Sequence, residues 1–515
     1  MATSFTDAFE TLHRIEYVGI PTHPLWNANI QRWRYLSDSF TGGNDYRRGE
    51  YLTKYIMEDG GEYSQRLANT PLDNHCKSVI DTYNAFLFRK PPYRDYGSID
   101  NDPALINFLE DADLEGRTFD AFMRDVSTQA SIYGMSWVVI DRPNTQVGTR
   151  AEELQQGIRP YVSLITPQNV INWDYQRQPN GLQKLSMVHI LESITDDVAV
   201  FKEYTAELIT TYRQHKDTEA EIIDQMINPL GEVPVVCVYA QRSEHKGVGV
   251  SDIADISDGQ KAIYNELSEI EALIRLQNHP SLVMPQGTDA QAGAGAIITL
   301  EQGMDPGLKP YLLQPSGASI ESLLKSIDSK VNSINRMANM GGVRNTVTTA
   351  MSGIALETEF QLLNARLAQK ADNLELAEEQ IWRIWASWQG QTWDGTIEYP
   401  DTFNIHDKQN TVALIQEAKK TLPQNPRLLT ELDHMLAKAL ITDEDILQEV
   451  LEDQQNTVAA PEGAEQQGQT SPDEMTHTEQ TTAAGLVSHL REMVAQNYTD
   501  EQILQLHPEL KKLEE

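Results

Sequence analysis

Apolar residues repeat at helical spacing in three long segments between residues 252 and 388. Helices are predicted over 252–278, 318–340 and 353–388. At 1.5 Å per residue the third helix would extend about 50 Å, so a single subunit can hardly cover its apolar stripe. That stripe consists of Leu356, Phe360, Leu363, Leu367, Leu374, Ile381, Ile384, Trp385 and Trp388. The pattern therefore predicts a rigid helical shaft that further copies of the chain help to cover.

The segments between these helices have a different character. Residues 279–317 hold three short apolar runs, at 281–284, 296–300 and 311–313, separated by glycines and prolines. This pattern predicts short strands, which would need partners from elsewhere. Residues 341–352 begin with two glycines and continue with polar and β-branched residues, which disfavour a helix. We therefore expect a small β-containing excursion after the first helix and a moving loop before the third.

The first 251 residues predict a mixed part with helices and strands. Helices are expected within 26–92 and as a pair within 102–134. The expected core of the first region is Trp26, Trp33, Tyr35, Val79, Tyr83, Phe86 and Phe88. Strands at 136–140, 161–165, 184–191, 198–204, 208–212 and 233–239 predict a mainly antiparallel sheet. The fold class is therefore α+β, mainly α.

Beyond residue 399 the predicted elements are shorter. Helices are expected at 411–420, 426–439 and 442–451. Residues 454–484 are rich in Gln, Glu, Thr, Ala and Pro, which predicts a disordered linker. Helical periodicity returns over 485–515, where we expect a terminal helical tail.

Several motifs, taken in their order, resemble those of tailed-bacteriophage portal proteins, the head-to-tail connectors. The run Gly249-Val250-Ser251-Asp252-Ile253, followed after the first helix by residues 281–284, resembles the junction of wing, stem and clip. Residues 351–357 and 364–368 resemble the segment that follows the portal tunnel loop. The amino-terminal wing is matched at 71–92 and 131–134. The resemblance covers roughly residues 30 to 450.

The resemblance implies a portal-like fold with a wing, a helical stem, a small β-containing clip and a helical crown. The wing would comprise residues 1–251 and the long helix over 353–399. The stem helices would be 252–278 and 318–340, the clip 279–317, the tunnel loop 341–352 and the crown 400–453.

The same resemblance implies the function. Portal proteins form a ring, usually dodecameric, at one capsid vertex, and double-stranded DNA passes through its channel during packaging and ejection. The clip binds the large terminase subunit and later the neck or adaptor proteins, while the major capsid protein surrounds the ring. The protein is expected in the virion, and in the host cytoplasm during assembly.

Three groups of candidate site residues follow. The DNA-channel candidates are Arg344, Lys325, Arg336 and Lys330. The tunnel-loop candidates are Gly341, Gly342, Val343, Asn345, Thr346, Thr348 and Thr349. The clip docking candidates are Gln286, Asp289, Gln291, Glu301, Gln302 and Asp305.

The cation candidates have alternatives. Lys325 and Arg336 are eleven residues apart and return to within roughly 20° of the same helix face, whereas Lys330 points elsewhere. Lys325 can instead pair with Glu321 four residues earlier, and Arg344 can form a salt bridge between subunits.

The charge balance fits a conduit better than a protein that grips DNA. The chain has 76 acidic and 41 basic residues, a net charge of −35, opposite to that of phosphate-binding proteins. Each neutralised phosphate would release counterions and add affinity that resists sliding. Simple solubility, or a halotolerant host, explains the acidity equally well.

Motifs for catalysis are lacking. The sequence has no phosphate-binding Gly-x-x-x-x-Gly-Lys and no His-Glu-x-x-His, so we assign no catalytic, cofactor-binding or metal-binding residue and expect a protein that is not an enzyme. Asp443 and Asp445 could hold a divalent ion, but acids at a helix start more often serve its dipole.

Cys76 and Cys237 lie in apolar surroundings and are expected as reduced thiols. No basic-then-apolar leader and no run of 18 apolar residues occurs, so neither secretion nor membrane insertion is expected.

Two other function classes stay open. One is a different capsid or head-tail adaptor protein, which would not need the 341–352 loop. The other is a metal-dependent nuclease or motor subunit that uses the acidic clusters.

Overall fold

The computed structural model describes residues 20–143, 152–284, 305–341 and 353–403, with short gaps inside these ranges, and scattered positions between 415 and 437. The chain divides into two units, Met1–Ile405 and His406–Glu515. In the second unit, Ile415, Ala418 and Lys419 are helical and agree with the helix expected at 411–420. The predictions for 442–451, 454–484 and 485–515 lie outside the described residues.

The amino-terminal region is helical, as predicted. It contains α2 (Pro24–Thr41), α3 (Gly43–Arg48), α4 (Gly60–Asn69) and α5 (His75–Leu87). The start of α4 has a reciprocal capping box, in which the Asp59 carboxylate accepts from the Glu62 backbone N–H and Glu62 accepts from Asp59. The pair α6 (Pro103–Glu110) and α7 (Phe119–Tyr133) follows where a helical pair was expected. Of the expected core, Trp26, Trp33, Val79 and Tyr83 are fully buried.

The strands form two larger sheets, so the prediction of one sheet was wrong. The first sheet has the order β3-β2-β9, from β2 (Met135–Asp141), β3 (Tyr161–Ile165) and β9 (Val235–Tyr239). The second has the order β4-β5-β6-β7-β8. Its strands are β4 (Val170–Arg177), β5 (Gln183–Ile194), β6 (Val198–Thr205), β7 (Leu208–His215) and β8 (Glu221–Ile227). All pairings are antiparallel, as expected, but β9 returns to β2 instead of extending the meander.

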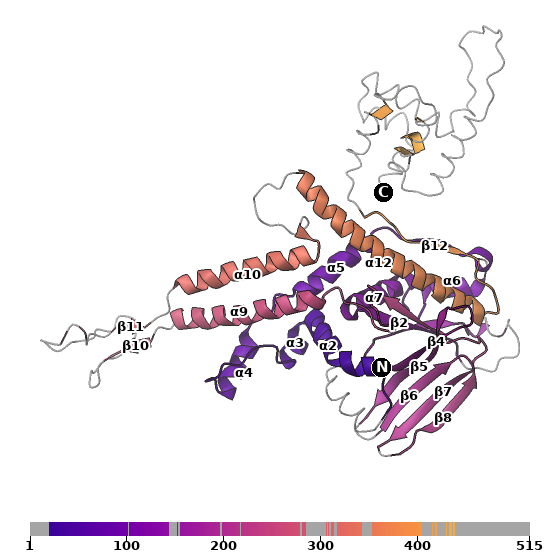
Figure 1. The fold of residues 1–515 in the computed structure, drawn as a ribbon, viewed down its shortest axis with the longest axis horizontal. Coiled ribbons are helices and arrows are strands. Elements are labelled where there is room, and N and C mark those ends of the chain that lie inside the picture. Colours follow the sequence, from indigo (N-terminus) through magenta and orange to yellow (C-terminus); the bar gives the residue numbers. More distant parts are fainter. Residues whose placement is uncertain are drawn as a thin grey trace, which may run out of the picture. The chain divides into compact units, whose positions relative to one another are not determined.

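Two long helices form a hairpin that extends away from these sheets (Figure 1). They are α9 (Ala254–Asn278) and α10 (Gly317–Met337), and they lie side by side. At their far end β10 (Ser281–Val283) pairs antiparallel with β11 (Tyr311–Leu313). The strand expected at 296–300 lies outside the described residues. The prediction carried α10 to residue 340, but Asn339 adopts a positive φ of 54°, a left-handed conformation that ends helices.

Helix α12 (Gly353–Trp388) has the predicted bounds. Its second half is central to the core, where Trp382 and Trp385 are fully buried and pack around Phe108. Past its end, β12 (Thr396–Glu398) pairs with β1 (Tyr93–Asp95), and the short 3-10 helix η1 (Gly97–Ile99) follows β1. From Leu363 to Trp388 every residue of the predicted apolar stripe is buried within this one chain, so the expectation that a single subunit can hardly cover the stripe was wrong for this part of the helix.

Candidate functional site

The helical hairpin is held together by one polar cluster and one close apolar contact. The Lys330 ammonium donates to Glu266 Oε1 at 2.6 Å, and the Ser326 hydroxyl donates to the same oxygen at 2.8 Å. Nearer the base of the hairpin, buried Ile334 of α10 lies against Gly259 of α9. Because glycine has no side chain, the two helices approach closely there. The cluster and the contact together fix the register of α10 on α9.

The three described DNA-channel candidates fall into two classes. Lys330 is partly buried and its charge is matched by Glu266. Lys325 and Arg336 are exposed, and neither takes part in an ion pair among the described residues. The alternative pairing of Lys325 with Glu321 is not among the ion pairs of the described region. Two of the three cations on α10 are thus exposed and form no ion pair with another described residue.

Most of the remaining candidates cannot be placed. Gly341, the first residue of the expected tunnel loop, is described and has a helical backbone. The other tunnel-loop residues and Arg344 lie outside the described residues, as do the clip candidates Gln286, Asp289, Gln291, Glu301 and Gln302. Asp305 is exposed and accepts a hydrogen bond from the Gly307 backbone N–H at 2.9 Å.

A buried ionic cluster that the sequence analysis missed joins α7, α9 and α12. The Asp252 carboxylate, 3% exposed, receives the Lys370 ammonium at 2.5 Å and the Arg366 guanidinium at 3.3 Å. Lys370 also donates to the Ser131 hydroxyl at 2.8 Å. Burial alone would raise the pKa of Asp252, but the two cations overcome it and hold that pKa below its usual value. This cluster anchors the residues just before α9 to the middle of α12.

A second buried cluster ties α12 to the β1–β12 pair. Glu378, fully buried, accepts from Arg94 Nε at 2.5 Å and from the Tyr399 hydroxyl at 2.6 Å. Trp382 Nε1 donates to the same carboxylate at 3.1 Å. The signal for both clusters was present in the sequence, because Lys370 and Glu378 occupy positions on the apolar stripe of α12, where an unpaired charge would be costly.

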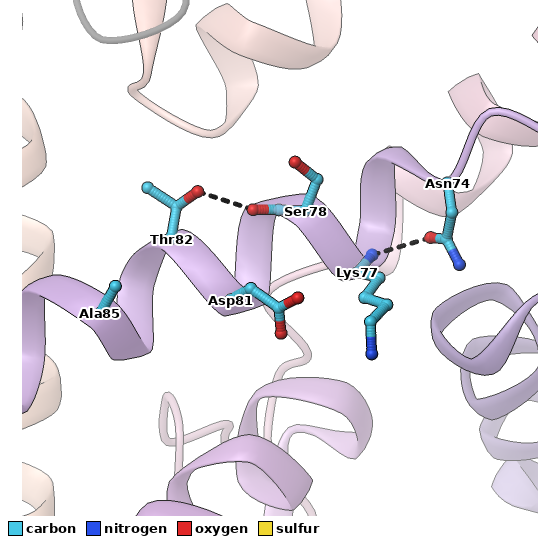
Figure 2. Close-up of a pocket in the computed structure, with 6 residues that line it drawn as sticks. All are labelled: Asn74, Lys77, Ser78, Asp81, Thr82 and Ala85. Carbon is cyan, nitrogen blue, oxygen red and sulfur yellow. Dashed lines mark hydrogen bonds between the residues drawn. The ribbon is translucent and has the colours of Figure 1, made fainter.

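A shallow hollow of about 420 Å³ runs along α5, lined by small and polar side chains (Figure 2). There the Asn74 side chain caps the helix by accepting a hydrogen bond from the Lys77 backbone N–H, and the Thr82 hydroxyl donates to the Ser78 carbonyl. These contacts serve the helix itself. Within the described ranges, no group of three or more His, Cys, Asp or Glu side chains is arranged to hold a metal ion.

Neither cysteine forms a disulfide, and Cys76 is fully buried while Cys237 is partly buried. Of the described helices, none is both long enough and apolar enough to cross a membrane.

Comparison with models of known protein families identifies the family of this chain. The family model described as "Phage portal protein, SPP1 Gp6-like" matches residues 29–472. This chain belongs to the phage portal protein family. Membership confirms the family predicted from the sequence and gives the chain a portal function in the phage capsid. The portal family is structural, which agrees with the expectation of a protein without catalysis.

Two solved structures resemble this portal-family chain at 9% sequence identity. The first, "Neck of empty GTA particle computed with C6 symmetry", has a TM-score of 0.42 and covers 76% of this chain and 99% of that chain. The second, "Virion of native gene transfer agent (GTA) particle", has a TM-score of 0.40 and covers 78% of this chain and 98% of that chain. Among curated proteins, none matches the sequence.

Proposed function

We propose that about a dozen copies of this chain form a closed ring at one capsid vertex, and that double-stranded DNA passes through the ring during packaging and ejection. The observation that carries the proposal is the succession of α9, the β10–β11 pair, α10, residues 341–352 and α12, in a chain that belongs to the portal family. In this reading α9 and α10 are the stem, residues 279–317 the clip and residues 341–352 the tunnel loop.

The remaining residues are assigned to the other parts of a portal protein. Residues 1–251 and 353–399 form the wing, and residues 400–453 form the crown. The linker at 454–484 and the tail at 485–515 follow. The major capsid protein surrounds the wing, and assembly takes place in the host cytoplasm.

Exposed apolar side chains on the hairpin and beside it support a ring. Ile56 and Met57, in the loop before α4, are 101% and 93% exposed, and Leu324 on α10 is 48% exposed. Arg66 holds the Ile56 loop in place, since its guanidinium donates to both oxygens of Glu58 and lies 3.9 Å from the Tyr55 ring centroid. A rigid apolar tip of this kind suits contact with a neighbouring copy.

Phosphate contacts are proposed for few cations. Arg344 in the tunnel loop and the exposed Lys325 and Arg336 on α10 face the DNA, while Lys330 stays with Glu266. The remaining lining is acidic or neutral, consistent with the net charge of −35. A sparse set of phosphate contacts limits counterion release, so the DNA slides instead of binding tightly.

The clip serves as the docking platform. Residues Gln286, Asp289, Gln291, Glu301, Gln302 and Asp305 contact the large terminase subunit during packaging, and neck or adaptor proteins afterwards. Asp305 is exposed near the hairpin's far end, which is compatible with this role.

Native mass measurement combined with electron microscopy of the purified protein tests the ring. A closed ring of about a dozen subunits with a central hole is expected. A stable monomer or dimer at high concentration and moderate salt would contradict the proposal. Deleting residues 343–352 then separates a portal from another head-tail adaptor, because intact rings with blocked DNA packaging are expected of a portal alone.

A further inference from the structure

Strand β8 is an unprotected edge of the five-stranded sheet. In that sheet its neighbour is β7, and no described strand pairs with its other side (Figure 1). Three isoleucines in seven residues are exposed, Ile222 by 52%, Ile223 by 41% and Ile227 by 78%. Such an edge is a template for pairing with another chain, and proteins usually block it with Pro, Lys or a covering segment. Residues 221–227 contain neither Pro nor Lys.

The register shows which backbone groups face outward. The Asn228 N–H donates to the Glu207 carbonyl at 2.8 Å, so these residues form a hydrogen-bonded pair. Since pairs alternate along an antiparallel ladder, Gln225 and Ile227 point their N–H and C=O groups away from β7. The Gln225 side chain donates a hydrogen bond to the Thr210 hydroxyl on β7 at 3.3 Å. Side chains of opposite residues lie closest together in non-hydrogen-bonded pairs, which favours such a contact.

The opposite edge of the sheet, strand β4, is contacted by another segment of the chain. There the His23 N–H donates to the Ile171 carbonyl at 2.9 Å, so the segment before α2 caps β4. Trp173 of β4 stacks on the His23 ring with centroids 4.2 Å apart. The chain itself therefore covers the start of the β4 edge, whereas no described segment bonds to the outward groups of β8.

Charge argues against a second copy as the occupant. In an antiparallel β8–β8 pair centred on Asp224, the two Asp224 carboxylates would lie directly opposite each other, which is destabilising. The occupant that fits is an extended segment of a different protein, apolar at alternate positions and basic or uncharged opposite Glu221 and Asp224.

We infer that β8 accepts a strand from another head protein by β-strand addition, which anchors the ring in the head. This inference rests on the proposed portal function, which supplies a setting in which other head proteins surround the ring. Main-chain hydrogen bonds to Gln225 and Ile227 give the affinity, and contacts with the exposed isoleucines give the preference for apolar side chains.

The test uses the full chain and a matched pair of variants. Gln225→Pro removes an outward N–H but leaves the β7 ladder intact, because proline is tolerated where the N–H faces solvent. Gln225→Ala loses the same side chain and keeps that N–H. Each is expressed with the complete set of head genes, and the portal content of purified heads is measured. The native mass of the rings is measured in parallel.

Gln225→Pro is expected to lower portal content by about tenfold, the effect of losing roughly 1.4 kcal/mol, with ring mass unchanged. Gln225→Ala is expected to match the unaltered protein. Amide hydrogen exchange over residues 221–227 should also slow on going from free rings to heads, a readout that needs no variant.

Three results would overturn the inference. They are equal portal content for both variants, unchanged exchange of β8 in heads, and a loss of ring mass in Gln225→Pro, which would make a second copy the occupant. Failure of the unaltered protein to form rings is a different outcome, since it would contradict the proposed function itself.

Discussion

Asp252 places a negative charge inside the protein, where the end of α7 and the start of α9 meet the middle of α12. Its carboxylate is paired with Lys370 and Arg366, and breaking such a buried pair leaves uncompensated charge. Asp252→Asn is therefore expected to destabilise the protein by about 3–5 kcal/mol. Urea unfolding at neutral pH measures the effect, and a change under about 1 kcal/mol would mean that the pair behaves like an exposed one.

The charge of Asp252 also predicts that the stability of the protein depends on pH. The folded-state pKa of Asp252 lies below the ordinary value of 3.8, so the unfolded chain takes up this proton first as pH falls. The stability from Asp252 is complete above the unfolded pKa and is lost as pH falls through the lower folded pKa. Unfolding free energies measured between pH 6 and 3 should fall less steeply in Asp252→Asn than in the unaltered protein.

Two glycines provide a test of close packing. A methyl group on Gly249 would clash with the carbonyl of Gly134, and both partners are backbone that cannot move aside. Gly249→Ala should lower stability by about 1–3 kcal/mol. Gly60→Ala is the matched control, since nothing lies within 4 Å of its added carbon. Thermal unfolding should show a lower midpoint for Gly249→Ala alone.

At the scale of elements, the helical hairpin depends on a short stretch of α10. Ile334 is fully buried against α9, so Ile334→Ala should cost about 2–5 kcal/mol locally. Hydrogen exchange is expected to accelerate along α10, while exchange in β2 and β9 stays slow. Ser329→Ala, an exposed change on the same helix, should leave exchange unaltered. Acceleration throughout the chain would contradict a local role.

The success of sequence-based prediction varied with the type of element. The bounds of α12 were predicted because its apolar repeat is long and uninterrupted by Pro or Gly. Strand β8 was missed, since its isoleucines occupy both faces and show no alternation. Strand β4 was missed too, because polar residues interrupt its apolar ones. The separation into two sheets depends on the return of β9 to β2, a non-local pairing that no short sequence window contains.

The candidate site was predicted in outline only. Exposure of Lys325 and Arg336 agreed with a helical face, but the engagement of Lys330 by Glu266 depends on how two helices align. The buried clusters around Asp252 and Glu378 join residues more than 100 positions apart. Their charges can be recognised in the sequence, whereas their partners cannot.

At the scale of the whole molecule, assembly must overcome charge repulsion. Every copy carries a net charge of −35, and added salt screens charges at the surface over a Debye length of about 8–10 Å near physiological ionic strength. Ring yield should therefore rise with added salt or divalent cations, as measured by native mass across a salt series. A yield that is highest in low salt would contradict this prediction.

Helix α12 is anchored in the core toward its carboxyl end, so its amino-terminal end moves whenever the helix tilts. From Leu363 to Trp388 its inner face is buried and held by Asp252, Arg94 and the carbonyl of Ile140. Between Gly353 and Trp382 the helix rises by roughly 44 Å, at 1.5 Å per residue. A rotation of the helix by about 5° about Trp382 would therefore move Gly353 by nearly 4 Å. The packing around Trp382 and Trp385 thus sets the direction of the helix, and a small change in that packing produces a larger displacement of Gly353.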